Sequence, residues 1–374
     1  MTQSPRSHIL ARMMEKVLFL LIPLIPCLLI FSMNAHAGNN HWQGTSYPVH
    51  LPAIGFLEAF QFSPIIFGPQ EVARGEWSVS STVTWVNVWA YNSWKDVYTH
   101  YNNNGITSQE KTPLSKLSAT GSYLVDLEAI CISNYFGYGC SQRLDVMVAI
   151  PVYYLGGGIM DDFIENFHDT FSLDQHRRTA MDKNRARIFF GDHDGSPFSM
   201  QGSQIEGVEL GNIVLDLGYR MRGSKPAISL RTAIKFPTHT GVSPTGQEGV
   251  DASFMYSTSW RWGNAYWHHG GGLIYYGDLG HPSLMLKQWR LCSATTIEYM
   301  TKYRFSGLFH MVANSSPAEY PKLDENVIEG SVGLRFYRDA YIVDVAVMEN
   351  FGAYDNSPDF GLFFEVRRRY GRPF

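Results

Sequence analysis

Four stretches of the sequence contain residue types that catalytic or ligand-binding sites use. The first has three glycines, Gly156, Gly157 and Gly158, ahead of a segment with helical periodicity, as in a phosphate-binding loop. The Gly-Lys-Ser/Thr ending of such a loop is missing, and the expected helix opens with Asp161 and Asp162, whose charges would repel a phosphate. The glycines therefore indicate a flexible hinge and not a nucleotide site.

Two further stretches resemble parts of known kinds of site. The sequence DHDG at 192–195 is similar to the middle of a calcium loop, but the acidic residue that closes such a loop is absent, so we interpret it as a hairpin turn. His281 and Ser283 are the base and nucleophile types of a hydrolase, without an obvious third residue to orient the histidine. We therefore predict no catalytic residue, no metal and no cofactor, and hydrolysis remains an alternative function.

The fourth stretch is bounded by Cys131 and Cys140, which flank ISNYFGYG, a sequence with the Asn and Gly residues of a turn. If this turn joins two strands, the two thiols could meet across a hairpin. In an oxidising compartment, a disulfide and two free thiols are equally compatible with the spacing. The sequence offers no Cys/His pair to complete a zinc site with them, which argues against zinc.

The N-terminal residues predict the compartment. Three basic residues precede an apolar run from Val17 to Met33, and a small-residue site, Ala35-His36-Ala37, follows, so residues 1–37 are predicted to be a cleaved secretory signal peptide. A signal anchor is the alternative, but two prolines in the run and the cleavage site favour removal. These residues hold three of the 30 basic and one of the 34 acidic side chains, so the mature chain is acidic, which argues against a nucleic-acid partner.

The secondary structure that positions these residues is predicted from apolar side chains that recur at every second residue. Between Ile228 and Phe236, for example, Ile, Leu, Thr and Phe occupy one face while Ser, Arg, Ala and Lys occupy the other. Such segments are predicted at 77–91, 122–132, 144–155, 208–219, 228–236, 250–262, 266–276, 288–300, 305–313, 327–337, 341–350 and 359–370. Their connections alternate between short and long, as periplasmic turns and external loops do. We therefore predict an all-β fold, a transmembrane antiparallel up-and-down β-barrel of about 12 strands with a helix-containing external loop.

The second face of these strands separates a barrel from a soluble β-sandwich, which is the alternative fold. It consists of Ser, Thr and Gly with scattered charges of both signs, which suits a small, hydrated lumen whose charges pair. The predicted lumen residues are Arg231, Lys235, Asp251, Arg335 and Asp344. Residues 38–74, ahead of the barrel at 75–374, are predicted to be either a periplasmic tail or a plug.

Within the loop at 156–207, residues 159–172 have the pattern of an amphipathic helix. Its apolar side chains fall within an arc of about 140°. The polar remainder carries four carboxylates, those of Asp161, Asp162, Glu165 and Asp169. Because helices that lie on lipid usually carry Lys and Arg instead, we predict that this helix packs at or inside the barrel mouth with its acidic face toward water. The carboxylates and the three glycines would then form a lid or constriction.

Several stretches together point to a known family. They are SPIIFGPQEVARGEWSVS (Ser63–Ser80), GGGIMDDFIENFHDTFSL (Gly156–Leu173), RARIFF (Arg185–Phe190), IKFPTHTG (Ile234–Gly241) and FEVRRRY (Phe364–Tyr370). In these motifs the chain resembles the bacterial outer-membrane family catalogued as domain of unknown function 3187, over essentially the whole mature chain. The resemblance implies an outer-membrane location and no established activity.

These patterns predict a narrow channel or small-molecule-binding barrel of the bacterial outer membrane, gated by the 156–207 loop, whose solute the sequence does not specify. A closed barrel with a structural or adhesive role is the alternative. The expected partners are outer-membrane lipid and the barrel-assembly machinery. The barrel-assembly machinery is expected because of the terminal strand, whose alternating apolar residues and final Phe374 are similar to the recognition signal of outer-membrane barrels.

Overall fold

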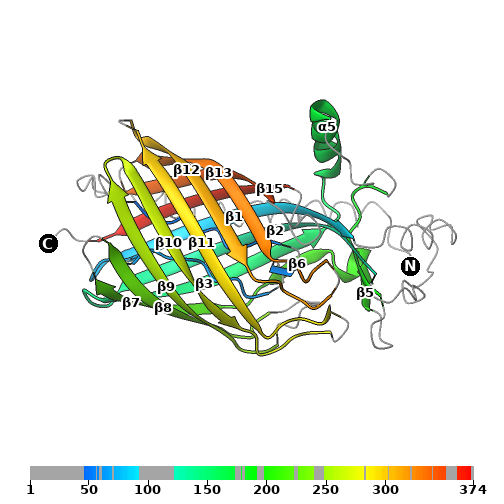
Figure 1. The fold of residues 1–374 in the computed structure, drawn as a ribbon, viewed down its shortest axis with the longest axis horizontal. Helices are drawn as coiled ribbons and strands as arrows, with labels where there is room; N and C mark the ends of the chain where they lie inside the picture. Colours follow the sequence, from blue (N-terminus) through cyan, green and yellow to red (C-terminus); the bar gives the residue numbers. More distant parts are fainter. Residues whose placement is uncertain are drawn as a thin grey trace, which may run out of the picture.

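The computed structural model describes residues 46–55, 57–58, 61–69, 71–91, 122–172, 178, 182–191, 198–222, 226–239, 248–281, 284–301, 303–320, 322–338, 340–350 and 360–371. Twelve of its strands form the wall of a barrel (Figure 1). They are β1 (Trp77–Tyr91), β2 (Tyr123–Gly139), β3 (Leu144–Gly156), β7 (Val214–Arg222), β8 (Ala227–Lys235), β9 (Asp251–Trp262), β10 (Ala265–Tyr275), β11 (Trp289–Met300), β12 (Phe305–Asn314), β13 (Val327–Arg338), β14 (Tyr341–Asn350) and β15 (Phe360–Tyr370).

The wall closes on itself. Each wall strand pairs antiparallel with the next one along the chain, and the first pairs with the last, with Trp77 of β1 opposite Tyr370 of β15. The connections at the end where these two residues lie are short, and those at the other end are long. We call these the short-turn end and the long-loop end. The predicted twelve-stranded, antiparallel up-and-down barrel is therefore confirmed.

The predicted hairpin between Cys131 and Cys140 is wrong, because β2 continues without interruption to Gly139. The two cysteines are nine residues apart along extended chain, a separation of roughly 30 Å at about 3.3 Å per residue, and both thiols are free. The glycine that suggested a turn has a different role. Gly137 faces the lumen, where an added Cβ would lie 2.9 Å from Val72 and would also overlap Met147, so only glycine fits. A disulfide between the two cysteines is thereby excluded.

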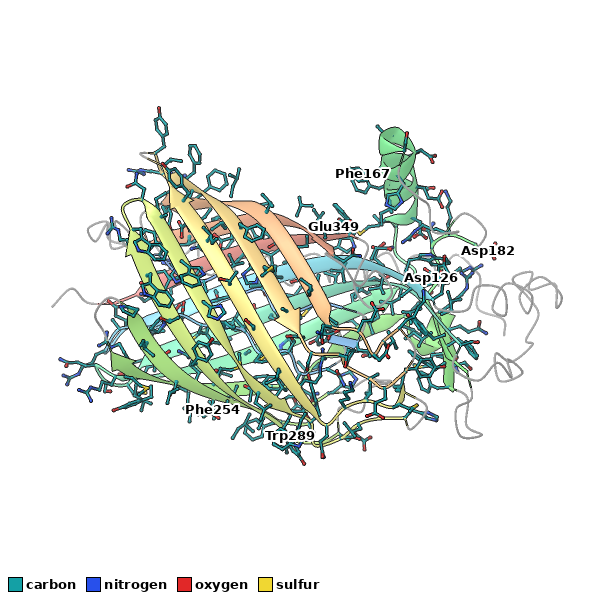
Figure 2. All side chains as sticks on the ribbon, in the orientation of Figure 1. Asp126, Phe167, Asp182, Phe254, Trp289 and Glu349 are labelled. Carbon is teal, nitrogen blue, oxygen red and sulfur yellow. The ribbon has the colours of Figure 1, made fainter. Side chains whose placement is uncertain are left out.

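The outer face of the wall is apolar and the inner face is polar or small. In β14, Val345 and Val347 are exposed on the outside, while Asp344 and Ala346 are buried on the inside. Large aromatic side chains are exposed near both ends of the wall, as Trp289 is in Figure 2. They include Trp77, Trp262, Tyr299 and Phe305 at the short-turn end, and Phe236 and Trp289 at the long-loop end. This distribution is typical of transmembrane barrels.

Smaller elements extend the wall at the long-loop end. They are α5 (Asp161–Phe171), β4 (Arg187–Phe190), β5 (Phe198–Gln201), the short 3-10 helix η3 (Gly202–Gln204) and β6 (Gly207–Leu210). β4 pairs with the first residues of β2, and β6 pairs with the last residues of β3. The strand predicted at 208–219 is thus divided into β6 and β7, opposite Pro151, which has no N–H to donate and instead accepts a hydrogen bond from Gly211 N at 2.9 Å. In the described part of the chain, no helix is long and apolar enough to cross a membrane.

The described residues between 46 and 74 lie inside the barrel, and we call this stretch the inner segment. Their apolar side chains pack against inward-facing wall residues: Ile54 and Leu57 belong to one buried cluster with Val86 and Ala129. Phe62 and Ile66 belong to a second buried cluster, with wall residues of β8 to β12. The inner segment therefore forms the core of the barrel.

Candidate functional site in the barrel lumen

The first pass of the inner segment runs from the short-turn end of the barrel to the long-loop end. Tyr47 O accepts a hydrogen bond from Arg335, near the last residues of β13, at 2.6 Å. Ile54 N donates to the Glu329 carboxylate, near the first residues of the same strand, at 2.9 Å. Buried backbone groups need hydrogen-bond partners. Side chains of the wall supply them here.

The second pass returns to the short-turn end. Next to β10 at the long-loop end, the Tyr276 hydroxyl donates to Phe62 O at 3.0 Å. Near the short-turn end, the Arg367 guanidinium of β15 donates to the Glu71 carboxylate at 2.7 Å and to the Glu365 carboxylate at 3.0 Å. All three of these charged side chains are fully buried. The inner segment thus reaches β1 after an ionic contact with β15.

The predicted lumen residue Arg335 is the centre of a second buried group of charges. Its Nε and Nη2 atoms donate to the two oxygens of Asp344 at 2.7 and 2.6 Å, and Nη1 donates to Glu298 at 2.9 Å. The fork geometry of a guanidinium matches a carboxylate in this bidentate way. A charge this deeply buried is tolerated because each of its partners is within hydrogen-bond distance.

The other predicted lumen residues belong to two more groups of buried charges. Arg231 donates to Asp145 at 2.8 Å and also contacts Asp216, and Lys235 lies 2.8 Å from Asp251. All of these side chains face inward and are buried. The structure therefore places all five predicted lumen residues inside the barrel, in three separate groups of ion pairs.

The charged residues of the inner segment were missed by the sequence analysis. Glu58 forms an ion pair with Arg290 of β11, and Glu71 pairs with Arg367. His50 lies 3.4 Å from Glu71. One signal was present, because the 46–74 stretch is rich in apolar residues and contains few charged ones, as expected for a segment that is buried except at specific ionic contacts.

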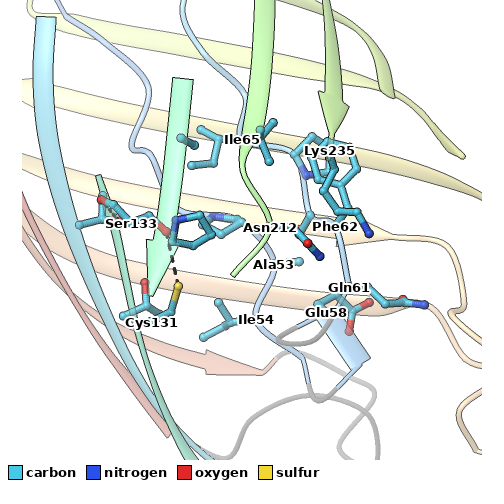
Figure 3. Close-up of a pocket in the computed structure, with 18 of the residues that line it drawn as sticks. Ala53, Ile54, Glu58, Gln61, Phe62, Ile65, Cys131, Ser133, Asn212 and Lys235 are labelled. Carbon is cyan, nitrogen blue, oxygen red and sulfur yellow. Dashed lines mark hydrogen bonds between the residues drawn. The ribbon is translucent and has the colours of Figure 1, made fainter. Parts of the chain in front are cut away.

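A cavity of about 110 Å³ remains between the inner segment and the wall (Figure 3). Ala53, Ile54, Phe62 and Ile65 line it from the inner segment, and residues of β1, β2, β3, β7 and β8 line it from the wall. These include Val86, Ala129, Met147, Val214 and Ala233, with Asp216 and Lys235 among the polar groups. The cavity can accommodate a few water molecules or a small organic molecule.

The predicted lid lies outside the barrel. The Phe163 ring of α5 contacts the Phe360 ring at 5.5 Å between centroids. Phe360 is on the outward side of β15, in line with the exposed Leu362 and Phe364. The apolar edge of the helix is bare, since Ile159, Phe163 and Phe167 are 68%, 53% and 39% exposed. Met160 and Ile164 of the predicted apolar face are buried, but this edge is exposed outside the barrel, so the prediction that the whole face is buried at or inside the mouth is wrong.

The glycines ahead of α5 allow close packing. Ile159 N and Met160 N at the start of the helix each donate to the Glu128 carboxylate at 2.8 Å. Gly158 has a φ of 65°, and a Cβ there would overlap that carboxylate. A Cβ on Gly157 would overlap the backbone at Asn184. These two glycines thus allow the chain to approach Glu128 and Asn184 closely, where the sequence analysis predicted a flexible hinge. Gly156, the last residue of β3, lies against the Tyr154 ring.

The carboxylates of α5 are partly paired within the same loop. Asp161 is buried and accepts from Arg178 at 2.8 Å. Lys183 contacts both Glu165 and Asp162, the second at 2.8 Å. The hydrogen bonds that Lys183 donates to Asp162 and then to Glu165 raise the pKa of its amine above the usual value. Asp169 is exposed. The prediction that the acidic face lies toward water therefore holds for Asp162 and Asp169 but is wrong for Asp161 and Glu165, which basic residues of the loop cover.

Four sequence predictions concern residues outside the described part of the chain. They are the signal peptide at 1–37, the DHDG stretch at 192–195, the serine of the His281/Ser283 pair and the final Phe374. The His281 ring contacts the Phe198 ring at 5.2 Å between centroids. Among the described residues, no three His, Cys, Asp or Glu side chains are grouped as metal ligands would be.

The fold and its lumen define a class of protein: a closed up-and-down β-barrel with an apolar exterior and a lumen occupied by its own N-terminal residues. The chain belongs to the family described as Protein of unknown function (DUF3187), whose model matches residues 25–370. The resemblance inferred from the motifs is therefore confirmed. The comparison with curated proteins found no match.

Several solved barrels are similar to this chain. The COG4313 outer membrane channel from Pseudomonas putida F1 is 11% identical, with a TM-score of 0.46, over 80% of this chain and 97% of that one. The toluene transporter TodX of P. putida is 8% identical, with a TM-score of 0.39, over 82% and 93%. The toluene transporter TbuX of Ralstonia pickettii is 9% identical, with a TM-score of 0.37, over 81% and 92%. At such low identity, these likenesses do not identify a solute for this chain.

Proposed function

We propose that the protein is a barrel of the bacterial outer membrane that binds or passes a small, weakly polar molecule, with the inner segment as its plug. The observation that carries this proposal is the cavity between the inner segment and the wall. A lumen packed only by wall side chains would have neither a separable plug nor a path beside it. Here a stretch of chain that is not part of the wall occupies the space, and its removal would leave a passage.

The outward-facing wall residues support the membrane location. Leu291 and Val332 are each 64% exposed, which would be costly in water over such a large surface. Exposed aromatic residues lie near both ends of the wall, where the two membrane interfaces would be. The expected signal peptide at 1–37 would direct the chain out of the cytoplasm. Outer-membrane lipid and, through β15, the barrel-assembly machinery are the proposed partners.

The lining of the cavity supports a small molecule with little charge. Most of the surface is aliphatic or aromatic, and the nearby charge of Lys235 is already paired with Asp251. An ion that entered would lose its hydration without gaining an unpaired counter-charge, which is unfavourable. A weakly polar molecule would instead gain apolar contacts.

The gate that this geometry supports is the inner segment and not the 156–207 loop. The inner segment lies across the lumen and bonds to β10, β13 and β15. Helix α5 is the element of that loop with the clearest amphipathic pattern, and it packs on the outer side of β15. A movement of α5 alone would leave the lumen filled.

Reconstitution of two deletion variants tests the proposal. Removal of residues 46–74 should raise single-channel conductance in planar bilayers and the rate at which liposomes swell in small neutral solutes. Removal of residues 159–173 should leave both close to the wild-type values. Heat-modifiable gel mobility would verify that each variant forms a barrel. A folded barrel that stays silent after removal of residues 46–74 would contradict the proposal and favour the closed structural barrel.

A further inference from the structure

Helix α5 presents an apolar edge that is largely exposed in the described part of the protein. Ile159, Phe163 and Phe167 follow each other at intervals of four residues, so they form one line along the helix. The Phe163 and Phe167 rings are stacked with centroids 6.4 Å apart. About 100° around the same helix from the middle of this line, the Ile164 side chain is buried. The edge is therefore a separate apolar surface and not an extension of the core.

This edge continues the outward-facing surface of the barrel. Phe163 contacts Phe360, the first residue of β15, and the next outward-facing residues of that strand are Leu362 and Phe364, both exposed. Figure 1 shows α5 standing out from the wall at the long-loop end, across the direction of the barrel. Phe167 lies on the side of the helix that is turned toward the barrel body (Figure 2). The edge thus faces the space beside the wall and not the lumen.

The base of α5 is held firmly against the outer face of β1 and β2. Glu128 accepts the N–H groups of Ile159 and Met160, just ahead of the first helical residue, and also accepts a hydrogen bond from Trp85 Nε1 at 2.6 Å. The negative charge at the helix N-terminus is favourable for the helix dipole. Arg178 pairs with Asp161 and also lies 5.4 Å from the Trp89 ring. These contacts fix the direction in which the helix leaves the wall.

The charges of α5 are compatible with a lipid surface once these contacts are included. Two of its four carboxylates, Asp161 and Glu165, are buried and paired with cationic side chains of the same loop. Asp162 and Asp169 lie roughly 100–120° around the helix from the middle of the apolar edge, at about 100° per residue. They would therefore lie beside the headgroups while the edge points toward the acyl chains.

We propose that α5 is an interfacial helix that rests on the outer leaflet next to β15 and inserts the edge formed by Ile159, Phe163 and Phe167 among lipid acyl chains. This inference rests on the outer-membrane location proposed above. The occupant is lipid because the edge is continuous with the wall surface that faces lipid. Burial of these side chains in the leaflet removes their apolar area from water, as in other interfacial helices.

Fluorescence quenching at single cysteines tests this inference. Phe167→Cys, Asp162→Cys and Val332→Cys are each made in a background without other cysteines, labelled with an environment-sensitive dye and reconstituted in vesicles of phosphatidylethanolamine and phosphatidylglycerol. Val332 is a wall control, and Asp162 marks the other side of the helix. Nitroxide-labelled lipid should quench the dye at 167 at least half as strongly as the dye at 332. Aqueous iodide should quench it several-fold less than the dye at 162.

The possible outcomes separate the two proposals. If the dye at 332 is quenched by lipid while the dye at 167 responds only to iodide, the barrel is in the membrane and the interfacial helix is wrong. If the dye at 332 is also inaccessible to lipid quencher, the membrane location fails, and the interfacial helix fails with it. Quenching by lipid at both 332 and 167, with iodide access at 162, supports the inference.

Discussion

The inner segment and helix α5 both combine apolar side chains with carboxylates, yet they lie on opposite sides of the same wall. In the inner segment, Leu57 and Val72 are buried and the carboxylate of Glu71 pairs with an arginine of the wall. In α5, the phenylalanine edge is bare and the acidic residues pair within their own loop. Composition alone therefore does not decide between lumen and exterior. The position of the cationic partners does.

The two regions also differ in how far apart along the sequence their contacting residues lie. Arg335 bonds to Tyr47 across 288 residues, and Arg367 bonds to Glu71 across 296. The pair between Lys183 and Asp162 spans only 21 residues. The inner segment thus depends on the whole closed barrel, whereas the α5 region depends mainly on its own loop and the adjacent strands. Local opening of the α5 region should therefore leave the barrel intact.

The largest expected effect is on stability and comes from the lumen. Arg335→Leu leaves Asp344 and Glu298 buried without their cationic partner, which should cost about 3–5 kcal/mol. Urea unfolding of the reconstituted barrel, followed by tryptophan fluorescence, measures it. Lys183→Met removes the central cation of the pairs near α5 and is the matched control. Because the Lys183 side chain is itself 40% exposed, a much smaller loss of stability than for Arg335→Leu is expected. Equal effects of the two variants would contradict the distinction between the regions.

Plug docking should respond to a smaller change. Glu71→Gln keeps the shape of the side chain but removes the charge that pairs with Arg367, and a hydrogen bond to a charged group contributes about 1.5–3 kcal/mol. The frequency of open events in single-channel recordings should rise about tenfold or more, since 1.4 kcal/mol is a factor of ten. The control is Asp162→Asn on α5. A rise in both variants would mean that the 156–207 loop contributes to gating.

The base of α5 should be sensitive to an added methyl group. Gly158→Ala places a Cβ against Glu128 at a positive φ, and the left-handed conformation alone costs about 1–2 kcal/mol. Hydrogen exchange should become faster in residues 160–171 and remain unchanged in the inner segment. Gly202 is the matched control, because its φ is also positive, at 51°, but a Cβ there meets nothing within 4 Å. Similar acceleration near both sites would leave no specific role for the Glu128 contact.

The smallest effect on stability is expected at the apolar edge. Phe163→Ser combined with Phe167→Ser should change the free energy of unfolding in detergent by less than about 1 kcal/mol, because both side chains are exposed. Lipid quenching of a dye at position 159 should nevertheless fall. Ile164→Ser, on the buried side of the same helix, should destabilise the loop clearly. A large loss of stability in the Phe double variant would show that protein, not lipid, covers the edge.

The strands could be predicted because a period of two records which side of a sheet faces an apolar environment. It predicted all twelve wall strands, but it ended β2 too early, since Gly137 and Gly139 resemble a turn when their close contacts with Val72 and Ala73 are unknown. The helix at 159–172 was predicted close to its observed bounds, Asp161–Phe171. Its surroundings could not be, because the segregation of apolar residues is the same for a helix that faces protein and for one that faces lipid.

The inner segment could be given only as one of two alternatives. It has no period of two, because its backbone bonds to wall side chains such as Glu329 and Tyr276. Those partners lie more than 200 residues away along the chain. The lumen residues such as Arg335 and Asp344 were found because they occupy the inward positions of regular strands.

The contact between Glu71 and Arg367 has a consequence for the order of assembly. Glu71 comes just before the first wall strand, and Arg367 is in the last one, so the pair joins the two edges of the sheet at the seam. If β15 joined β1 first, Arg367 and Glu365 would be enclosed without Glu71, and the inner segment would then have to be threaded into a finished cylinder. If the inner segment folds back before β15 pairs with β1, the charges of Arg367 and Glu365 are not enclosed without Glu71, and no threading is needed. The last strand to be made would then close the barrel around a plug that is already in place.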